Sequence, residues 1–266
     1  MPIFRIGNFD DFSATFADIE PPMVAKFVSE NAEQPNVPKK QSPTEMFRQI
    51  SAVMEANKNI KQNPIFFEKS VGKRGIALKS LKLLKGFEGF IENAYNASNE
   101  LYLLSWGWDF SGEPPYYYPE VQEHYDKSII QMAAGDTREF LGSGLVLFPS
   151  RQITAGIALR IMIWESDQGV RNFGYTMKKV SNAIQESNLN KILSSIGTIP
   201  QPTINLINTI KNASFELADI IGDLLEKNAD DYVDLFEGYY PASVDWTEGE
   251  ESYTGYASEI TLNRMK

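Results

Sequence analysis

The chain has 266 residues, no cysteine, and 35 acidic against 25 basic residues, which gives a net charge of −10. Without cysteine, disulfides, thiolate nucleophiles and thiolate metal sites are excluded, and the negative charge argues against a dedicated nucleic-acid binder. With 42% hydrophobic and 23% charged residues, the composition is that of a globular protein. The length suits one large domain, or one domain with an insertion.

Residues 1–41 have the character of an arm followed by a linker. The arm carries scattered large apolar residues and is interrupted by prolines: Phe4, Ile6, Phe9, Phe12 and Phe16, then Pro21, Pro22, Pro35 and Pro38. The polar stretch 29–41 is typical of a linker. Because each large apolar side chain left in water would forgo roughly 1.5–3 kcal/mol, we expect the arm to pack on its own domain or on a neighbouring subunit.

Residues 42–266 are predicted to form a single β-sandwich-like domain. Ser42-Pro43-Thr44-Glu45 combines a capping serine, a proline at the first helical position and a glutamate three residues after the serine, which predicts a helix over 43–58. Three or four antiparallel strands are expected between residues 65 and 110, because apolar runs alternate there with turn residues. A further short strand is expected at 145–148.

The clearest strand signal lies at residues 157–164. An aliphatic set and a second, mostly apolar set alternate with a period of two: Ile157, Leu159, Ile161 and Ile163, and Ala158, Arg160, Met162 and Trp164. This period places the two sets on opposite faces of a sheet. Because both faces are largely apolar, we expect this strand at the centre of the sheet, with the aliphatic set in one core layer.

Amphipathic helices are predicted between about residues 170 and 227. Apolar residues recur at helical spacing on both sides of Pro200-Gln201-Pro202, which indicates two helices in an antiparallel hairpin. Strand signals return at 232–240 and 256–262. The predicted class is therefore α+β, an antiparallel β-sandwich with an inserted amphipathic helical hairpin and an N-terminal arm.

Few patterns in the sequence support catalysis. His124 is the only histidine; it has no nucleophile-elbow motif nearby and excludes zinc sites with several imidazoles. Neither a P-loop nor a dinucleotide-binding glycine motif occurs. A carboxylate-based hydrolase remains an alternative, because five acidic residues fall at or near predicted strand ends: Glu100, Asp109, Glu113, Glu165 and Asp167.

An aromatic cluster is the best candidate binding surface in the sequence. It comprises two tryptophans, an aspartate and a run of three tyrosines: Trp106, Trp108, Asp109, Tyr116, Tyr117 and Tyr118. Flat aromatic faces beside acidic groups suit sugar rings or a protein partner. In the alternative interpretation, the tryptophans pack between layers of the fold and the tyrosines line a loop.

Two acidic clusters are candidate cation sites. The first comprises Asp230, Asp231, Asp234 and Glu237. The second comprises Asp245, Glu248, Glu250 and Glu251. With its sequel it forms the series Val244-Asp245-Trp246-Thr247-Glu248, Tyr253-Thr254-Gly255-Tyr256 and Ile260-Thr261-Leu262, which resembles the late calcium loop and last strand of C2 domains. The resemblance implies a β-sandwich that binds sugars or lipid headgroups with the help of calcium, with Asp245 and Glu248 as metal ligands. Thr247 stands where that family usually has a second aspartate.

The leading hypothesis is a non-enzymatic structural or interaction protein that binds a protein partner, or a second copy of itself, through its N-terminal arm. Three alternatives stay open: a C2-like module, an exported toxin or effector whose helices at 170–227 act on a membrane, and a hydrolase. No cofactor other than calcium is expected. No signal peptide and no apolar run of about 18 residues is visible, so we expect no integral membrane segment, and either a cytoplasmic location or export without a signal peptide.

Overall fold

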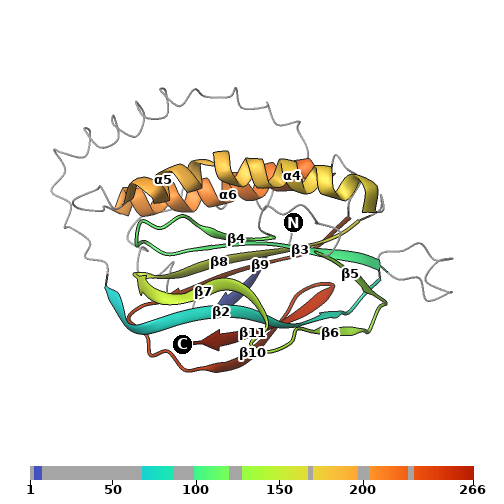
Figure 1. The fold of residues 1–266 in the computed structure, drawn as a ribbon, viewed down its shortest axis with the longest axis horizontal. Helices are drawn as coiled ribbons and strands as arrows, with labels where there is room; N and C mark the ends of the chain where they lie inside the picture. Colours follow the sequence, from blue (N-terminus) through green and yellow to red (C-terminus); the bar gives the residue numbers. More distant parts are fainter. Residues whose placement is uncertain are drawn as a thin grey trace.

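The computed structural model describes residues 3–7, 68–86, 99–119, 128–166, 170–196, 204–226 and 231–266. These residues form two stacked β-sheets and a layer of helices that covers the outer face of one sheet (Figure 1). The α+β class and the two-sheet sandwich are thus as predicted. The predicted helix at 43–58, the strand signals at 65–67 and 87–95, and His124 lie outside the described residues.

The sheet under the helices, called sheet A, has six strands in the order β1-β9-β8-β3-β4, with β5 also paired to β3. Their bounds are β1 Ile3–Gly7, β9 Asp231–Pro241, β8 Gly156–Glu165, β3 Asn99–Trp108, β4 Tyr116–Tyr118 and β5 Ile129–Met132. Among the strand pairs that the structure describes, only β1–β9 is parallel. The predicted antiparallel pattern therefore has an exception at this edge.

The second sheet, sheet B, has five strands in the order β10-β11-β2-β6, with β7 also paired to β2. Their bounds are β10 Gly249–Thr254, β11 Ser258–Met265, β2 Lys69–Leu83, β6 Thr137–Glu139 and β7 Leu145–Thr154. Sheet B lies on the face of sheet A opposite the helices (Figure 1). Sheet A is consequently the middle layer of three.

Strand β8 occupies the predicted central position, between β9 and β3. Its aliphatic residues all join the core between the two sheets, as the period of two predicts: Ile157, Leu159, Ile161 and Ile163. The alternate residues Ala158, Met162 and Trp164 join a second core between sheet A and the helices. Arg160 points to that same helix side and is fully buried there.

The helical layer consists of α4 (Val170–Glu186), α5 (Asn188–Ile196) and α6 (Ile204–Glu226). Two helices were predicted, but the first segment is divided at Ser187, whose hydroxyl accepts a hydrogen bond from the backbone N–H of Asn190 at 3.1 Å. Ser187 is thus the N-cap of α5. Both α4 and α5 pack against α6. In the part of the chain that the structure describes, no helix is long and apolar enough to cross a membrane.

Candidate functional site

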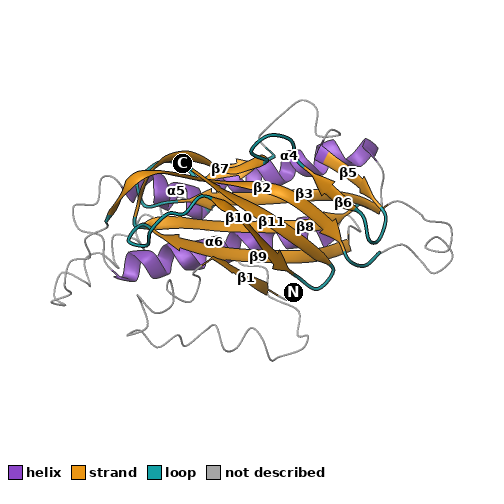
Figure 2. Cartoon of the chain, turned by 90° about the horizontal axis from the view of Figure 1, so that it is seen from below, coloured by secondary structure: helices purple, strands orange, loops and turns teal. Residues whose placement is uncertain are grey.

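The first described residues of the N-terminal arm form the edge of sheet A. Strand β1 runs parallel to β9, with Ile3 opposite Leu235 and Gly7 opposite Tyr239, and Figure 2 shows it at the margin of the sheet. The β9 residues that receive it, 235–239, are called here the acceptor edge. Residues 8–41 of the predicted arm, with Phe9, Phe12 and Phe16, lie outside the described residues.

Ile6 fits a space that a glycine provides on the acceptor edge. Its side chain is fully buried in the inter-sheet core, opposite Gly238. A Cβ atom built on Gly238 would lie 2.7 Å from Ile6 Cδ1 and closer still to Cγ1. Because real Cβ atoms are not found so close, Gly238 is required for this packing. Phe4 adds a tilted ring contact with Phe236, with centroids 5.7 Å apart.

A chain of charged side chains, exposed at Arg5 and buried at Glu237 and Arg160, connects β1 to the helical layer. The Arg5 guanidinium contacts one carboxylate oxygen of Glu237, and Arg160 donates to the other at 2.6 Å. Arg160 also donates to the backbone carbonyl of Ser214 in α6 at 2.7 Å and lies 4.0 Å from the centre of the Phe215 ring. Burial lowers the pKa of Arg160, and the neighbouring Glu237 opposes that shift. Glu237 therefore contacts both the terminal strand and the arginine that binds α6.

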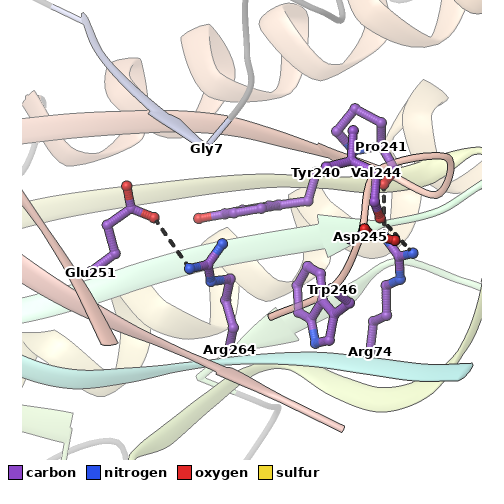
Figure 3. Close-up of a pocket in the computed structure, with 9 residues that line it drawn as sticks. All are labelled: Gly7, Arg74, Tyr240, Pro241, Val244, Asp245, Trp246, Glu251 and Arg264. Atoms are coloured by element: carbon purple, nitrogen blue, oxygen red, sulfur yellow. Dashed lines mark hydrogen bonds and ion pairs between the residues drawn. The ribbon is translucent and has the colours of Figure 1, made fainter. Parts of the chain in front are cut away.

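A small pocket opens where β1 ends at Gly7 (Figure 3). The backbone N–H of Gly7 donates to the Tyr253 hydroxyl of β10 at 3.2 Å, which ties β1 to sheet B. The pocket volume is about 50 Å³, room for a few water molecules. Its lining combines two arginines, two carboxylates and two aromatic residues: Arg74, Arg264, Asp245, Glu251, Tyr240 and Trp246.

Arg74 is an internal support of the pocket wall rather than a free cation. Its guanidinium donates to three backbone carbonyls, those of Pro241 at 2.7 Å and of Ala242 and Val244 at 2.8 Å each. It also lies 5.3 Å from the centre of the Trp246 ring. Burial lowers the pKa of Arg74, while the charge of Asp245 raises it. Arg74 thereby fixes the loop that follows β9, as Figure 3 shows.

The proposed calcium ligands lie on the loop before β10. Asp245 and Glu248 are both exposed, and Asp245 lies on the pocket wall beside Arg74. Among the residues that the structure describes, no three or more acidic or histidine side chains converge closely enough to hold a metal ion. The positive charge of Arg74 beside Asp245 disfavours a divalent cation there. Calcium binding through Asp245 and Glu248 stays a prediction.

The other acidic cluster divides between the two faces of β9. Asp234 points inward and is buried, next to an irregularity in the β8–β9 register between Ile163 and Trp164. Its carboxylate accepts hydrogen bonds from the backbone N–H groups of Tyr256, Ala257 and Ser258 and from the Ser258 hydroxyl. Asp234 thus holds the β10–β11 turn, whereas Glu237 binds Arg160 and Arg5. The structure does not unite the two carboxylates in one cation site.

The predicted aromatic surface is divided between buried tryptophans and half-buried tyrosines. Trp106 and Trp108 are buried in the helix-facing core, and Trp106 Nε1 donates to the Ser214 hydroxyl at 3.3 Å. Their rings therefore pack between layers of the fold instead of forming a surface patch. Tyr116, Tyr117 and Tyr118, in β4, are half-buried, so only this part of the predicted binding surface reaches solvent.

Among the candidate carboxylates, Asp109 has a structural role, and the others differ in burial. Asp109 is fully buried; it accepts hydrogen bonds from Arg151 at 2.9 Å, from the Ser111 hydroxyl at 2.6 Å and from the Thr154 N–H at 2.9 Å. Glu165 is buried, Glu100 half-buried and Glu113 exposed, while Asp167 lies outside the described residues. These positions single out no acid–base pair for hydrolysis.

Sequence reasoning missed three residues that build the site: Gly238, Glu237 as a partner of Arg160, and Arg74. A glycine inside a strand pattern is a signal of close backbone or side-chain approach, and an arginine inside an apolar strand requires a buried partner. These signals were available in the sequence, but they do not say which segment approaches.

Comparisons with known proteins identify no family. No family model and no curated protein matches the chain. Two solved structures are similar: human GIVD cytosolic phospholipase A2 in complex with methyl gamma-linolenyl fluorophosphonate and terbium chloride, and Drosophila C2-DSL-EGF1. The first has TM-score 0.30 and 8% identity over 75% of this chain and 18% of that chain. The second has TM-score 0.29 and 6% identity over 73% and 66%. TM-scores this low do not define a shared fold, so the C2 resemblance stays a prediction.

Proposed function

We propose that this chain is a non-enzymatic structural protein that associates with other copies of itself through its N-terminal arm. The observation that carries the proposal is the docking of β1 on the acceptor edge. A five-residue strand, far in sequence from its partner, is held by a buried isoleucine over Gly238 and by the ion pair of Arg5 with Glu237. A short strand with so specific a binding site is suited to assembly.

The surroundings of the acidic and basic side chains support the same proposal. Four buried charged groups hold parts of the fold together: Asp109 at the end of β3, Asp234 at the β10–β11 turn, Arg160 under α6 and Arg74 in the loop after β9. Their hydrogen bonds explain their burial without a substrate.

The test is the mass of the protein in solution. Light scattering after size-exclusion chromatography is expected to give the full chain a mass that is a multiple of 30.0 kDa and that rises with concentration. A chain lacking residues 1–7 is expected to elute at the mass of one copy. Arg138→Glu, which changes an exposed residue of β6, serves as a control for altered charge and is expected to associate normally. A full chain that has the mass of one copy at all concentrations would contradict the proposal.

A further inference from the structure

The pairing of β1 with β9 does not depend on a short connection. Residues 8–67, 60 in number, separate the end of β1 at Gly7 from the first described residue of the next segment, Glu68. A chain of that length can extend roughly 200 Å at about 3.3–3.6 Å per residue, farther than the dimensions of a domain of this size. The length of the connection therefore allows β1 to reach the acceptor edge of its own copy or that of another.

The acceptor edge needs a strand. Without β1, the backbone N–H and C=O groups along one side of β9 are left unpaired, and an open strand edge of this kind is a template for another chain. The space above Gly238 loses Ile6, which is otherwise fully buried, and the Glu237 oxygen that faces Arg5 loses its partner. Each of these losses destabilises a copy whose acceptor edge is empty.

A second copy supplies the missing strand with identical contacts. Its β1 carries the same isoleucine for Gly238, the same arginine for Glu237 and the same backbone groups, so binding within one copy and between two copies differ mainly in the entropy of the connection. The effective concentration of a tethered strand at its own site falls as the connection lengthens, and this connection has 60 residues. Exchange between copies therefore becomes competitive where the protein is concentrated.

We propose that β1 is exchanged between copies, so that residues 3–7 of one chain occupy the acceptor edge, residues 235–239, of a second chain. The inference rests on the proposed function and adds to it the strand that is donated and the surface that receives it. Each copy has one donor strand and one acceptor edge, which is the requirement for reciprocal dimers or for longer head-to-tail chains.

Two complementary variants test the exchange. Ile6→Asp damages the donor strand and leaves the acceptor edge intact, because a carboxylate cannot replace the buried isoleucine. Gly238→Val blocks the acceptor edge, since its side chain occupies the space of Ile6, and leaves the donor strand intact. Matched controls are Val71→Asp and Gly72→Val in β2, because Val71 is exposed and no atom lies within 4 Å of a Cβ built on Gly72.

Each variant alone is expected to have the mass of one copy, 30.0 kDa. A solution of Ile6→Asp contains no intact donor strand, and a solution of Gly238→Val contains no open acceptor edge. When the two are mixed, Gly238→Val chains donate β1 to Ile6→Asp chains, so the mass of the complex is expected to double and its composition to be one to one by native mass spectrometry. Both control variants are expected to associate as the unmodified chain does. Milder changes, Ile6→Ser and Gly238→Ala, repeat the test if the first pair fails to fold.

The outcomes separate the two proposals. If the unmodified chain and both controls associate, but the mixed variants, folded by circular dichroism, stay at the mass of one copy, exchange of β1 is overturned while association through the arm stands. If the unmodified chain itself has the mass of one copy at all concentrations, the proposed function fails together with the exchange. Restored one-to-one complexes support both.

Discussion

The two faces of sheet A bury their side chains in different ways. The face toward sheet B contributes to a mainly apolar core, in which Ile157, Leu159, Ile161 and Ile163 of β8 pack against aliphatic and aromatic residues of the opposing sheet. Asp234 is also buried on this face, where it bonds to the β10–β11 turn. The face toward the helices buries apolar residues too, but it also buries the pair of Arg160 and Glu237. The neighbours Arg160 and Ile161 on one strand thus belong to two different kinds of core.

The difference shows how the two outer layers are held in place. Apolar burial is roughly proportional to area and has little directional preference, and register in sheet B comes from strand pairing. The helices have no such pairing to sheet A. Their position is fixed by directional contacts that converge on Ser214 of α6, whose carbonyl accepts from Arg160 and whose hydroxyl accepts from Trp106. Buried hydrogen-bonded pairs of this kind specify position more than they add stability.

The largest effect is expected from breaking the buried ion pair on the helix side. Arg160→Met leaves Glu237 buried with the partly exposed Arg5 as its remaining charged partner, which is expected to cost about 3–5 kcal/mol of unfolding free energy. Urea denaturation measures this loss. The double variant Arg160→Met/Glu237→Leu removes both charges and is expected to recover much of the stability. The double variant would contradict a directional role for the pair if its loss of unfolding free energy equalled the sum of the losses of the single variants Arg160→Met and Glu237→Leu.

A somewhat smaller and purely apolar effect is expected on the other face of β8. Ile161→Ala removes buried methyl groups from the inter-sheet core and is expected to cost about 2–5 kcal/mol. Ile130→Ala, a half-buried position in β5, is the matched control with a lesser loss. An effect of Ile161→Ala below about 0.5 kcal/mol would mean that β8 does not occupy the centre of the core.

The smallest effect concerns an acidic residue on the helix layer. Asp219 is exposed at its surface, but partial desolvation raises its pKa above the ordinary value of 3.8, and the nearby Asp223 and Glu216 act in the same direction against the attraction of Arg160. Because the folded state holds this proton more tightly, the stability due to Asp219 is complete below pH 3.8 and is lost as the pH rises through the raised pKa. Asp219→Asn is therefore expected to melt at a slightly higher temperature than the unmodified chain at about pH 7, and at the same temperature at about pH 3.

The control for Asp219→Asn is Glu186→Gln, which removes one negative charge from an exposed position in α4. Thermal melting by circular dichroism at the two pH values compares the variants. If both variants raise the melting temperature equally at about pH 7, the effect comes from net charge and not from the surroundings of Asp219.

The sequence predicts the elements whose signal is local. The period of two in residues 157–164 identifies both the strand β8 and its two buried faces, because side-chain direction in a strand alternates regardless of what lies above it. Helical spacing finds the segments of α4 and α6 for the same reason. The division at Ser187 could also have been predicted, since a serine three residues before Asn190 is a normal cap position.

Long-range relations could not be predicted in this way. The residues of β1 carry an apolar pattern, but nothing in five residues indicates a parallel partner that lies more than two hundred residues away, as Arg5 and Glu237 do. The tryptophans of β3 illustrate the same difficulty, since their pattern is compatible with a surface or a core until the helices are placed over them. Arg74 and Gly238 gain their roles only from the segments that approach them.

The most direct measurement of the central claim is hydrogen–deuterium exchange of β9 in the unmodified chain and in Ile6→Asp. If β1 occupies the acceptor edge, the amides of β9 that face it are protected in the unmodified chain and exchange faster in Ile6→Asp, whereas those paired with β8 keep their protection. Val71→Asp is expected to show the protection of the unmodified chain. Equal protection of β9 in the unmodified chain and in Ile6→Asp would contradict the account, because the acceptor edge would then not depend on the N-terminal strand.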